Sequence, residues 1–203
     1  MRRSVVVPFL LLLLAAGCGG SGRRAATTTG STTVPSAPGT TTAAASPGAL
    51  QAEANATAAG DIPDNQVFLV FHNPTAGYTM KYPEGWAQQG SGGRVTFRDK
   101  NNIVRIAVAT GPRPTNASVQ RGVASARIES LPRRMTVSGH PTYKIVYSTV
   151  SAPNAVTGKR VKLVVDRYEL WSRGRLAVVD LGTPEGVDNV DAYRLMIESF
   201  RWR

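Results

Sequence analysis

The stretch between Gly77 and Trp86 constrains the fold of this chain more than any other. Within it, Tyr78, Met80 and Tyr82 alternate with polar residues. Alternation with a period of two is typical of a strand that buries one face and exposes the other. The pattern therefore predicts a core strand whose three large side chains point inward while its polar side chains meet solvent.

A turn follows this strand and returns a tryptophan to it. Pro83 ends the ladder because its nitrogen carries no proton to donate, and Gly85 gives the backbone the freedom that a turn requires. Trp86 is then expected to pack against the aromatic face of the strand. We treat Tyr78, Tyr82, Pro83 and Trp86 as the core motif of the domain.

The first residues predict export and lipid attachment. Two arginines precede an apolar run at 5–16, which is shorter than the roughly 20 apolar residues needed to cross a bilayer core of about 30 Å. These features are typical of a signal peptide, here assigned to residues 1–17. The small residues before Cys18, the only cysteine, resemble the bacterial lipobox, so we expect Cys18 to carry diacylglycerol and palmitate. The alternative is an uncleaved anchor helix with an incidental thiol.

The next segment, residues 18–61, is expected to be a disordered linker. It is rich in Thr, Ala, Ser, Gly and Pro and lacks aromatic residues, so it cannot bury enough apolar surface to offset the entropy of ordering. A flexible coil of this length has a root-mean-square span of roughly 35 to 40 Å. The sequence thus predicts a folded domain at 62–203, tethered to the extracytoplasmic face of the cell membrane.

The folded domain alternates apolar runs with turn residues, which predicts an α+β fold. Strands are expected at 67–71, 78–82, 94–99, 103–109, 140–150, 161–171 and 175–181, and helices at 115–131 and toward the C-terminus. So few helices cannot serve as crossovers between parallel strands. We therefore predict an antiparallel sheet of about six or seven strands with helices packed on its faces.

Three local details accompany this prediction. The asparagines of the 100–102 turn are expected to take the left-handed conformation, and the glycines at 90–93 are expected to form a flexible loop. In the C-terminal helix, an apolar stripe recurs at intervals of three and four and is expected to be buried. The stripe consists of Val190, Tyr193, Ile197 and Phe200.

Three segments resemble the PsbP-like superfamily. They are the strand and turn at 78–86, the segment from Val137 to Tyr147, and the closing segment from Ala192 to Phe200. The superfamily includes the photosystem protein PsbP, the Ran-binding Mog proteins and many bacterial lipoproteins. The resemblance covers about residues 65–203 and implies an antiparallel sheet with helices on its faces and a role in binding proteins. It supplies no catalytic residues, and the photosystem and Ran functions are not transferred because fold does not determine function.

The chain is strongly basic, with a formal charge of +11. From residue 62 onward there are 20 Lys and Arg against 11 Asp and Glu. Such a domain is attracted to anionic phospholipids or wall polymers, unless its charges are spread evenly over the surface. Nucleic acid is not expected, because aromatic residues are not interleaved with the basic ones. The candidate basic patch consists of Arg133, Arg134, Lys159, Arg160, Lys162, Arg173 and Arg175.

The residues that carry catalytic or metal chemistry are sparse. His72 and His140 are expected at turns and belong to no ligand spacing, so we predict no metal and no cofactor. Asp166 and Asp180 fall on neighbouring predicted strands. The nearby Arg167 and Arg175 favour ion pairs over a catalytic pair of acids.

Three functions remain open at this point. The leading hypothesis is a membrane-anchored extracytoplasmic lipoprotein that binds or assembles an envelope protein or an anionic polymer and is not an enzyme. An envelope hydrolase would require a concave pocket with several carboxylates or with the two histidines close together. A small-ligand carrier would require an apolar cavity between sheet and helix.

Overall fold

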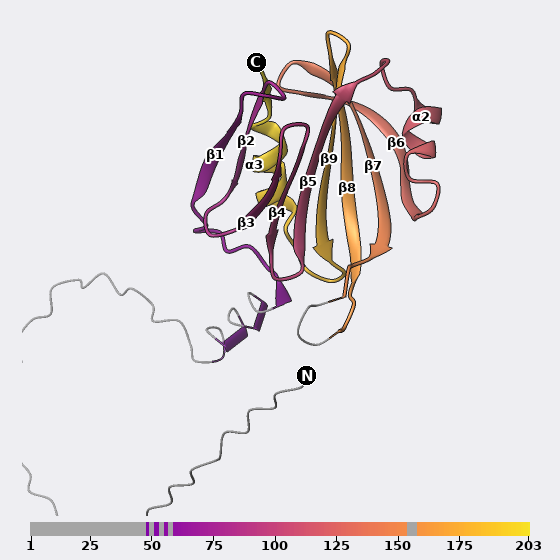
Figure 1. Cartoon of the computed structure of the whole chain (residues 1–203). Coiled ribbons are helices and arrows are strands. Elements are labelled where there is room, and N and C mark those ends of the chain that lie inside the picture. The colour runs from indigo at the N-terminus through magenta and orange to yellow at the C-terminus, as the bar shows by residue number, and fades with distance from the viewer. Residues whose placement is uncertain (1–47, 49–50, 53–54, 57–58, 154–157) are drawn as a thin grey trace, which may run out of the picture. The chain divides into compact units, whose positions relative to one another are not determined.

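The computed structural model describes residues 48, 51–52, 55–56, 59–153 and 158–203 (Figure 1). The predicted signal peptide, the lipidation site at Cys18 and most of the predicted linker lie outside these residues. Within the described ranges, no helix has the length and apolar content that crossing a bilayer requires.

The described part of the chain is dominated by β-strands (Figure 1). The strands are β1 (Phe68–Asn73), β2 (Tyr78–Pro83), β3 (Ala87–Ser91), β4 (Arg94–Asp99), β5 (Asn102–Thr110), β6 (Arg127–Val137), β7 (His140–Val150), β8 (Lys162–Ser172), β9 (Arg175–Pro184) and β10 (Arg201–Trp202). Helix α2 spans Asn116–Arg121 and helix α3 spans Val190–Glu198.

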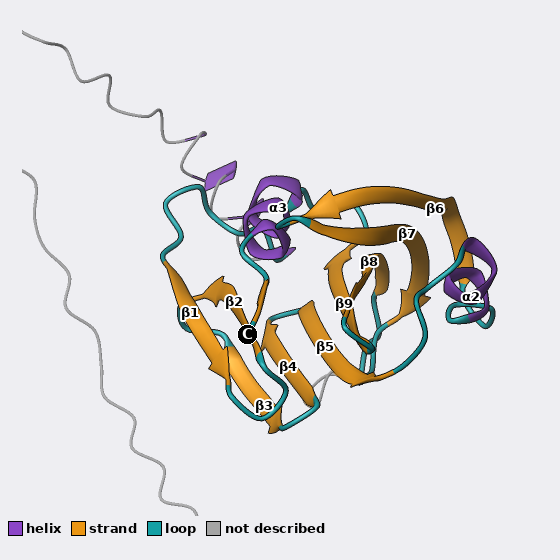
Figure 2. Ribbon diagram, turned by 90° about the horizontal axis from the view of Figure 1, so that it is seen from above, coloured by secondary structure: helices purple, strands orange, loops and turns teal. Residues whose placement is uncertain are grey.

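The strands form two antiparallel sheets (Figure 2). One sheet has the order β1-β2-β10, and the other has the order β3-β4-β5-β9-β8-β7-β6. The predicted antiparallel pairing is confirmed. The prediction of a single sheet with helices covering its faces is not, because α2 and α3 are only six and nine residues long. The fold is β-rich and contains two short helices.

The principal core combines side chains from both sheets and from α3. Its aromatic residues contact one another directly: the Tyr78 ring stacks on Phe200 at 5.4 Å between centroids, and the Tyr82 ring stacks on Phe97 at 4.4 Å. Such pairs contribute about 0.5 to 1.5 kcal/mol each beyond the area they bury. Trp86 is 8% exposed and belongs to the same cluster, as the sequence pattern predicted.

One residue of β2 departs from the predicted alternation. Thr79 was expected to face solvent, but it is buried. It pairs with Arg201 of β10, a strand of two residues that no sequence pattern indicated. The end of α3 also lies against β2, where the Lys81 backbone nitrogen donates to Ser199 Oγ at 2.7 Å. Strand β10 and the end of α3 thus cover this part of β2, although the local pattern assigned Thr79 to solvent.

A second cluster lies on the opposite face of the seven-stranded sheet, which we call the α2 face. Tyr143, Ile145 and Tyr147 of β7 supply its centre and are all buried. Val119 of α2 and Val165 of β8 pack into the same cluster. The alternation of strand side chains separates these residues from the principal core on the other face.

The predicted helix at 115–131 is largely wrong. Thr115 is the N-cap of the helix that does form, because Thr115 Oγ1 accepts a hydrogen bond from the Ser118 backbone nitrogen at 3.2 Å. The helix ends at Arg121, and the chain continues as edge strand β6. Pro132 lies where the pairing with β7 shifts register, a position at which proline is tolerated within an edge strand.

Two turns differ from their predictions. Residues 90–93 were expected to be a loop, but Gly90 lies within β3 and pairs with Val95 of β4. Its φ is +82°, and a Cβ there would lie 2.4 Å from Arg94 O, so only glycine fits. In the β4–β5 turn, Lys100 rather than an asparagine has a positive φ, at 50°.

Helix α3 buries most of its predicted stripe. Tyr193, Ile197 and Phe200 are buried, and the Tyr193 hydroxyl donates to Gly182 O of β9 at 2.7 Å. Val190, the first residue of the helix, is 62% exposed, so its predicted burial is wrong. At the other end, Arg201 donates to the carbonyls of Glu198 and Phe200, which places a positive charge at the negative end of the helix.

A buried asparagine attaches the start of the domain to its body. Asn189 Oδ1 accepts from the Ile62 backbone nitrogen at 2.8 Å, and Asn189 Nδ2 lies within hydrogen-bond distance of Gly60 O, Asn102 Oδ1 and Thr183 Oγ1. Asn102 also donates to Gly60 O, at 2.5 Å. We call these five residues the Asn189 latch. It determines the end of the domain at which the chain arrives from the N-terminus.

Candidate functional site

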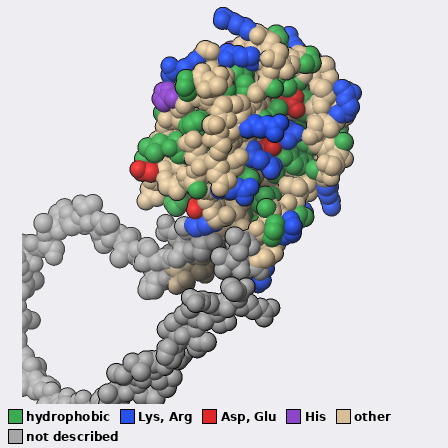
Figure 3. Space-filling view, viewed as in Figure 1, with side chains coloured by type: hydrophobic (Ala, Val, Ile, Leu, Met, Phe, Trp, Pro, Cys, Tyr) green, Lys and Arg blue, Asp and Glu red, His purple; other side chains and the backbone are tan. Residues whose placement is uncertain are grey.

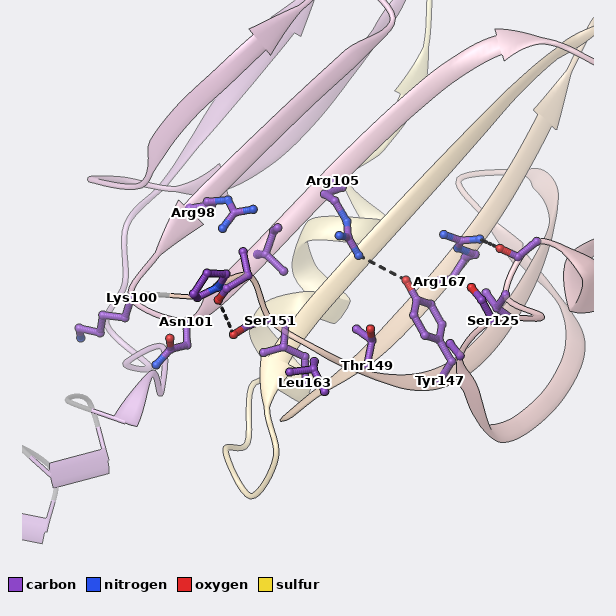
Figure 4. Close-up of a pocket in the computed structure, with 17 residues that line it drawn as sticks. Arg98, Lys100, Asn101, Arg105, Ser125, Tyr147, Thr149, Ser151, Leu163 and Arg167 are labelled. Carbon is purple, nitrogen blue, oxygen red and sulfur yellow. Dashed lines mark hydrogen bonds between the residues drawn. The ribbon is translucent and has the colours of Figure 1, made fainter. Parts of the chain in front are cut away.

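An open groove of about 520 Å³ lies on the α2 face of the seven-stranded sheet (Figure 4). Four basic residues line it, together with polar and apolar neighbours. The basic residues are Arg98, Lys100, Arg105 and Arg167; the polar ones include Asn101, Ser125, Tyr147, Thr149 and Ser151; the apolar ones include Ile103, Val123, Val150 and Leu163. A space-filling view shows Lys and Arg side chains gathered on this side of the domain, with acidic side chains between them (Figure 3).

Strand register brings these charges together. Arg105 of β5 pairs with Asp180 of β9, which pairs in turn with Arg167 of β8. The three residues therefore form one row across three adjacent strands, with all side chains on the α2 face. Arg98 reaches the same face from β4, where it pairs with Ile103.

Asp180 holds both guanidinium groups of this row. Arg167 Nε and Nη2 donate to its two carboxylate oxygens at 2.7 and 3.1 Å, and Arg105 Nε lies 3.4 Å from Oδ2. The Asp180 side chain is only 8% exposed, whereas that of Arg105 is 43% exposed. The predicted ion pair of Asp180 with Arg167 is confirmed. Arg175, the other predicted partner, instead donates to backbone carbonyls.

The neighbours of Arg167 keep it charged and fixed. Burial alone would lower the pKa of the guanidinium, but the hydrogen bonds and charge of Asp180 raise that pKa above its usual value. Arg167 Nη1 donates to Gly122 O at 2.7 Å, which ties the end of α2 to the sheet. Its guanidinium also lies over the Tyr147 ring, 5.3 Å from the centroid.

Tyr147 contributes a neutral hydroxyl to the groove. Burial and the charge of Asp180 raise the pKa of Tyr147, so its hydroxyl keeps its proton at neutral pH. Arg105 Nη2 lies 3.4 Å from this oxygen and donates to it, as Figure 4 shows. Because the hydroxyl oxygen accepts a hydrogen bond from Arg105, the hydroxyl proton of Tyr147 can point toward a bound molecule.

The groove is suited to holding an anion. Its lining, which lies wholly within the described residues, includes four cationic side chains and no Asp or Glu. Asp180 lies beneath the arginines and offsets one of their charges. The lining therefore contains no pair of carboxylates of the kind that performs general acid–base catalysis.

The other acids and the histidines lie elsewhere. Asp166 pairs with Lys144 on the opposite face of the sheet, at 2.5 Å. His140 begins β7 next to a turn, as predicted, whereas His72 lies within β1 rather than at a turn. Among the residues that the structure describes, no group of three or more His, Cys, Asp or Glu side chains is arranged to hold a metal ion.

The structure separates the seven residues of the candidate basic patch. Arg133 and Arg134 lie on edge strand β6. Lys159, Arg160 and Lys162 lie at the start of β8, whereas Arg173 and Arg175 lie at its far end, about 33 Å away at the usual rise of a strand. None of the seven lines the groove.

Several of them have local partners instead. Arg134 donates to the Tyr143 hydroxyl at 2.6 Å, Arg160 donates to Ser151 O at 2.9 Å, and Lys162 pairs with Glu185. The groove arginines escaped the sequence analysis because each is a single basic residue in a strand. They could have been identified from their position, because Arg98 and Arg105 both lie on the polar face of a predicted hairpin.

Glu169 lies beside Arg167 below the groove and makes stability depend on pH. Burial raises the pKa of Glu169, the charge of Arg167 opposes this rise, and the charge of Asp180 adds to it. The folded-state pKa therefore exceeds the unfolded value of about 4.3. Since the folded state then holds the proton more tightly, the contribution of Glu169 to stability falls as pH rises through this window.

We expect Glu169→Gln to gain stability relative to the wild type as pH rises from about 4, levelling off above the folded-state pKa. Urea unfolding of both proteins at several pH values measures this difference. Glu198→Gln, at an exposed position, controls for the general loss of one negative charge. A stability difference that is the same at every pH would show that Glu169 ionises alike in the folded and unfolded chains.

Comparison with known proteins finds similarities in fold. No protein-family model matches the sequence, and no curated protein is similar enough in sequence to count as a relative. Cyanobacterial PsbP from Synechocystis sp. PCC 6803 is 19% identical with a TM-score of 0.51, over 71% of this chain and 98% of that chain. The Ran-binding protein Mog1p of Saccharomyces cerevisiae is 9% identical with a TM-score of 0.45, over 68% of this chain and 96% of that chain.

A third likeness is to LpqN of Mycobacterium tuberculosis, described as involved in cell envelope biogenesis. It is 15% identical with a TM-score of 0.37, over 68% of this chain and 91% of that chain. At such low sequence identities, these similarities concern the fold alone. The likeness to cyanobacterial PsbP, at a TM-score of 0.51, agrees with the resemblance carried by the 78–86 motif and the two later segments. The folded domain of this chain therefore has the PsbP-like fold.

Proposed function

We propose that this protein is a lipid-anchored, extracytoplasmic module that binds an anionic component of the cell envelope without catalysing a reaction on it. The observation that carries the proposal is the groove on the α2 face. Arg105 and Arg167 are held there in one orientation by a shared, buried Asp180, so that little side-chain entropy is lost when an anion binds. An envelope protein with an acidic surface and an anionic polymer are the predicted partners.

The two other functions that the sequence left open have less support. A hydrolase of the type considered needs carboxylates that converge on a pocket, and the groove lining contains none. A carrier needs an apolar cavity between sheet and helix. The second groove, near Arg134 and Tyr143, is open and lined by basic and polar groups as well as apolar ones.

The anchor is tested by Cys18→Ala in a bacterial host fed a labelled fatty acid. We expect the wild type to be labelled and processed, and the variant to remain an unlabelled precursor, because the thiol is the proposed site of acylation. Ser21→Ala, three residues away, is the matched control and should be processed normally. A Cys18→Ala protein that still carries the acyl label would refute the anchor.

The binding role is tested with a photo-crosslinking amino acid at Ser125, on the rim of the groove, in intact cells. We expect an anionic envelope component to be captured, and an added Arg98→Ala substitution to reduce the capture. The same crosslinker at Asn116, which is exposed on α2, is the control position. Equal capture from both positions, or turnover of an ester or phosphoester substrate by the purified protein, would contradict a non-catalytic binding role for the groove.

A further inference from the structure

The groove lining combines cationic and apolar side chains. Arg105 and Arg167 lie near the Tyr147 hydroxyl, Arg98 and Lys100 lie toward Asn101 at the other end, and Leu163 lies between (Figure 4). Val150, at the end of β7, also lines the groove and is 60% exposed. A ligand that fills the groove would meet cationic side chains at both ends and apolar surface between them.

The end of the groove at Lys100 and Asn101 is also the end at which the chain arrives from the N-terminus. Asn101 lines the groove, and its neighbour Asn102 donates to Gly60 O in the Asn189 latch. Gly60 therefore lies next to this end of the groove. With the lipid anchor proposed above, the linker would leave the domain here and hold this end within reach of the membrane surface.

Arg98 is available to such a ligand. The side chains of Arg105 and Arg167 are engaged by hydrogen bonds and ion pairs with Asp180, Tyr147 and Gly122. The Arg98 side chain, by contrast, is exposed and makes no hydrogen bond or ion pair with any described residue. It points into the groove in Figure 4 and carries the planar donor set that suits a phosphate oxygen pair.

We infer that the groove binds the headgroup of an anionic phospholipid. The phosphodiester would lie between Arg98 and Arg105, headgroup hydroxyls would meet Ser125 and Tyr147, and the glycerol backbone would lie over Val150. Polar donors and apolar surface in one groove fit a phospholipid better than they fit a wall polymer, which carries phosphate and hydroxyl groups only. The inference rests on the proposed anchor for its orientation toward the bilayer, but not for the binding itself.

The test uses the full chain and soluble probes, so that the N-terminal segment is identical in every protein compared. Dihexanoyl phosphatidylglycerol below its micellar concentration is titrated and followed by backbone chemical shifts. Inorganic phosphate and a poly(glycerol phosphate) are titrated in parallel. We expect shifts at Arg98, Tyr147 and Val150 with the lipid, and weaker binding of the other two probes.

Two variants separate the contributions of the cationic and the apolar side chains. Arg98→Ala should weaken lipid binding about tenfold, because one charge-assisted hydrogen bond is lost. Arg94→Ala, on the same face of the same strand but outside the groove, is its control. Val150→Asp should weaken lipid binding and leave phosphate binding unchanged, whereas Val190→Asp, at the similarly exposed start of α3, should do neither.

The outcomes that overturn the inference are distinct. If inorganic phosphate binds as tightly as the lipid, the apolar side chains contribute nothing and the groove is a simple phosphate site. If poly(glycerol phosphate) binds more tightly than the lipid, the ligand is a wall polymer. If Arg98→Ala binds the lipid like the wild type, the groove is not the site. A processed, lipid-labelled Cys18→Ala protein would refute the anchor alone, because these titrations do not depend on it.

Discussion

Replacing Asp180 with alanine is expected to lower the free energy of unfolding by about 3 to 5 kcal/mol. The Asp180 carboxylate is 8% exposed and is the counterion of Arg167, whose side chain is itself only 16% exposed. Without Asp180, the Arg167 guanidinium would keep its hydrogen bond to Gly122 O but lose a bidentate partner in a site largely shielded from water. Urea unfolding monitored by tryptophan fluorescence measures the loss, since urea, unlike guanidinium chloride, does not screen charges.

Asp191→Ala is the matched control for this substitution. Asp191 pairs with Arg194 at 3.2 Å, but its side chain is 88% exposed. A surface pair of this kind contributes roughly 0 to 1 kcal/mol, so this variant should unfold almost like the wild type. If Asp180→Ala cost no more than Asp191→Ala, the row of Arg105, Asp180 and Arg167 would not be the rigid platform on which the groove proposal depends.

Replacing Asn189 with alanine is expected to lower the free energy of unfolding by about 2 to 4 kcal/mol. The substitution removes the acceptor of the Ile62 amide and the donor that serves Gly60 O and Thr183 Oγ1. Each buried polar group left without a partner costs about 1 to 3 kcal/mol, and the cost is partly offset because Asn102 still donates to Gly60 O.

The Asn189 variant should also free the start of the domain locally. Hydrogen exchange of the Ile62 amide is expected to be slow in the wild type and, in the variant, to become fast well before global unfolding. Asn116→Ala is the control, since Asn116 has the same side chain at an exposed helical position. An Ile62 amide that stays protected in Asn189→Ala would show that the Asn189 latch does not hold this segment.

The strands that the sequence predicted share one property: their apolar alternation is visible within the strand. The strands that it missed lack this signal. β3 is exposed at every residue, β6 carries charges and Pro132, and β10 is two residues long. Each of them becomes a strand only because a stronger neighbour offers it a ladder of hydrogen bonds, and that information lies elsewhere in the chain.

The residues of the candidate site also divide into those whose placement the sequence could predict and those whose placement it could not. The pair of Arg167 and Asp180 was predictable, because both residues lie at equal distance from the tight turn at Arg173-Gly174 and so must face each other across the hairpin. Arg105 and Arg98 belong to a different hairpin. Nothing local indicates which residue of β5 will stand opposite Asp180.

By itself, the sequence determined the antiparallel character of the sheets, the aromatic residues of the core and the register within the β8–β9 hairpin. These follow from side-chain alternation and turn geometry, which act over a few residues. Only the tertiary structure decided that β5 pairs with β9, and this long-range pairing places Arg105, Asp180 and Arg167 in one row. The pairing of β5 with β9 forms because it buries apolar side chains on both faces of the sheet. The groove, and the meeting of its arginines, are consequences of that pairing.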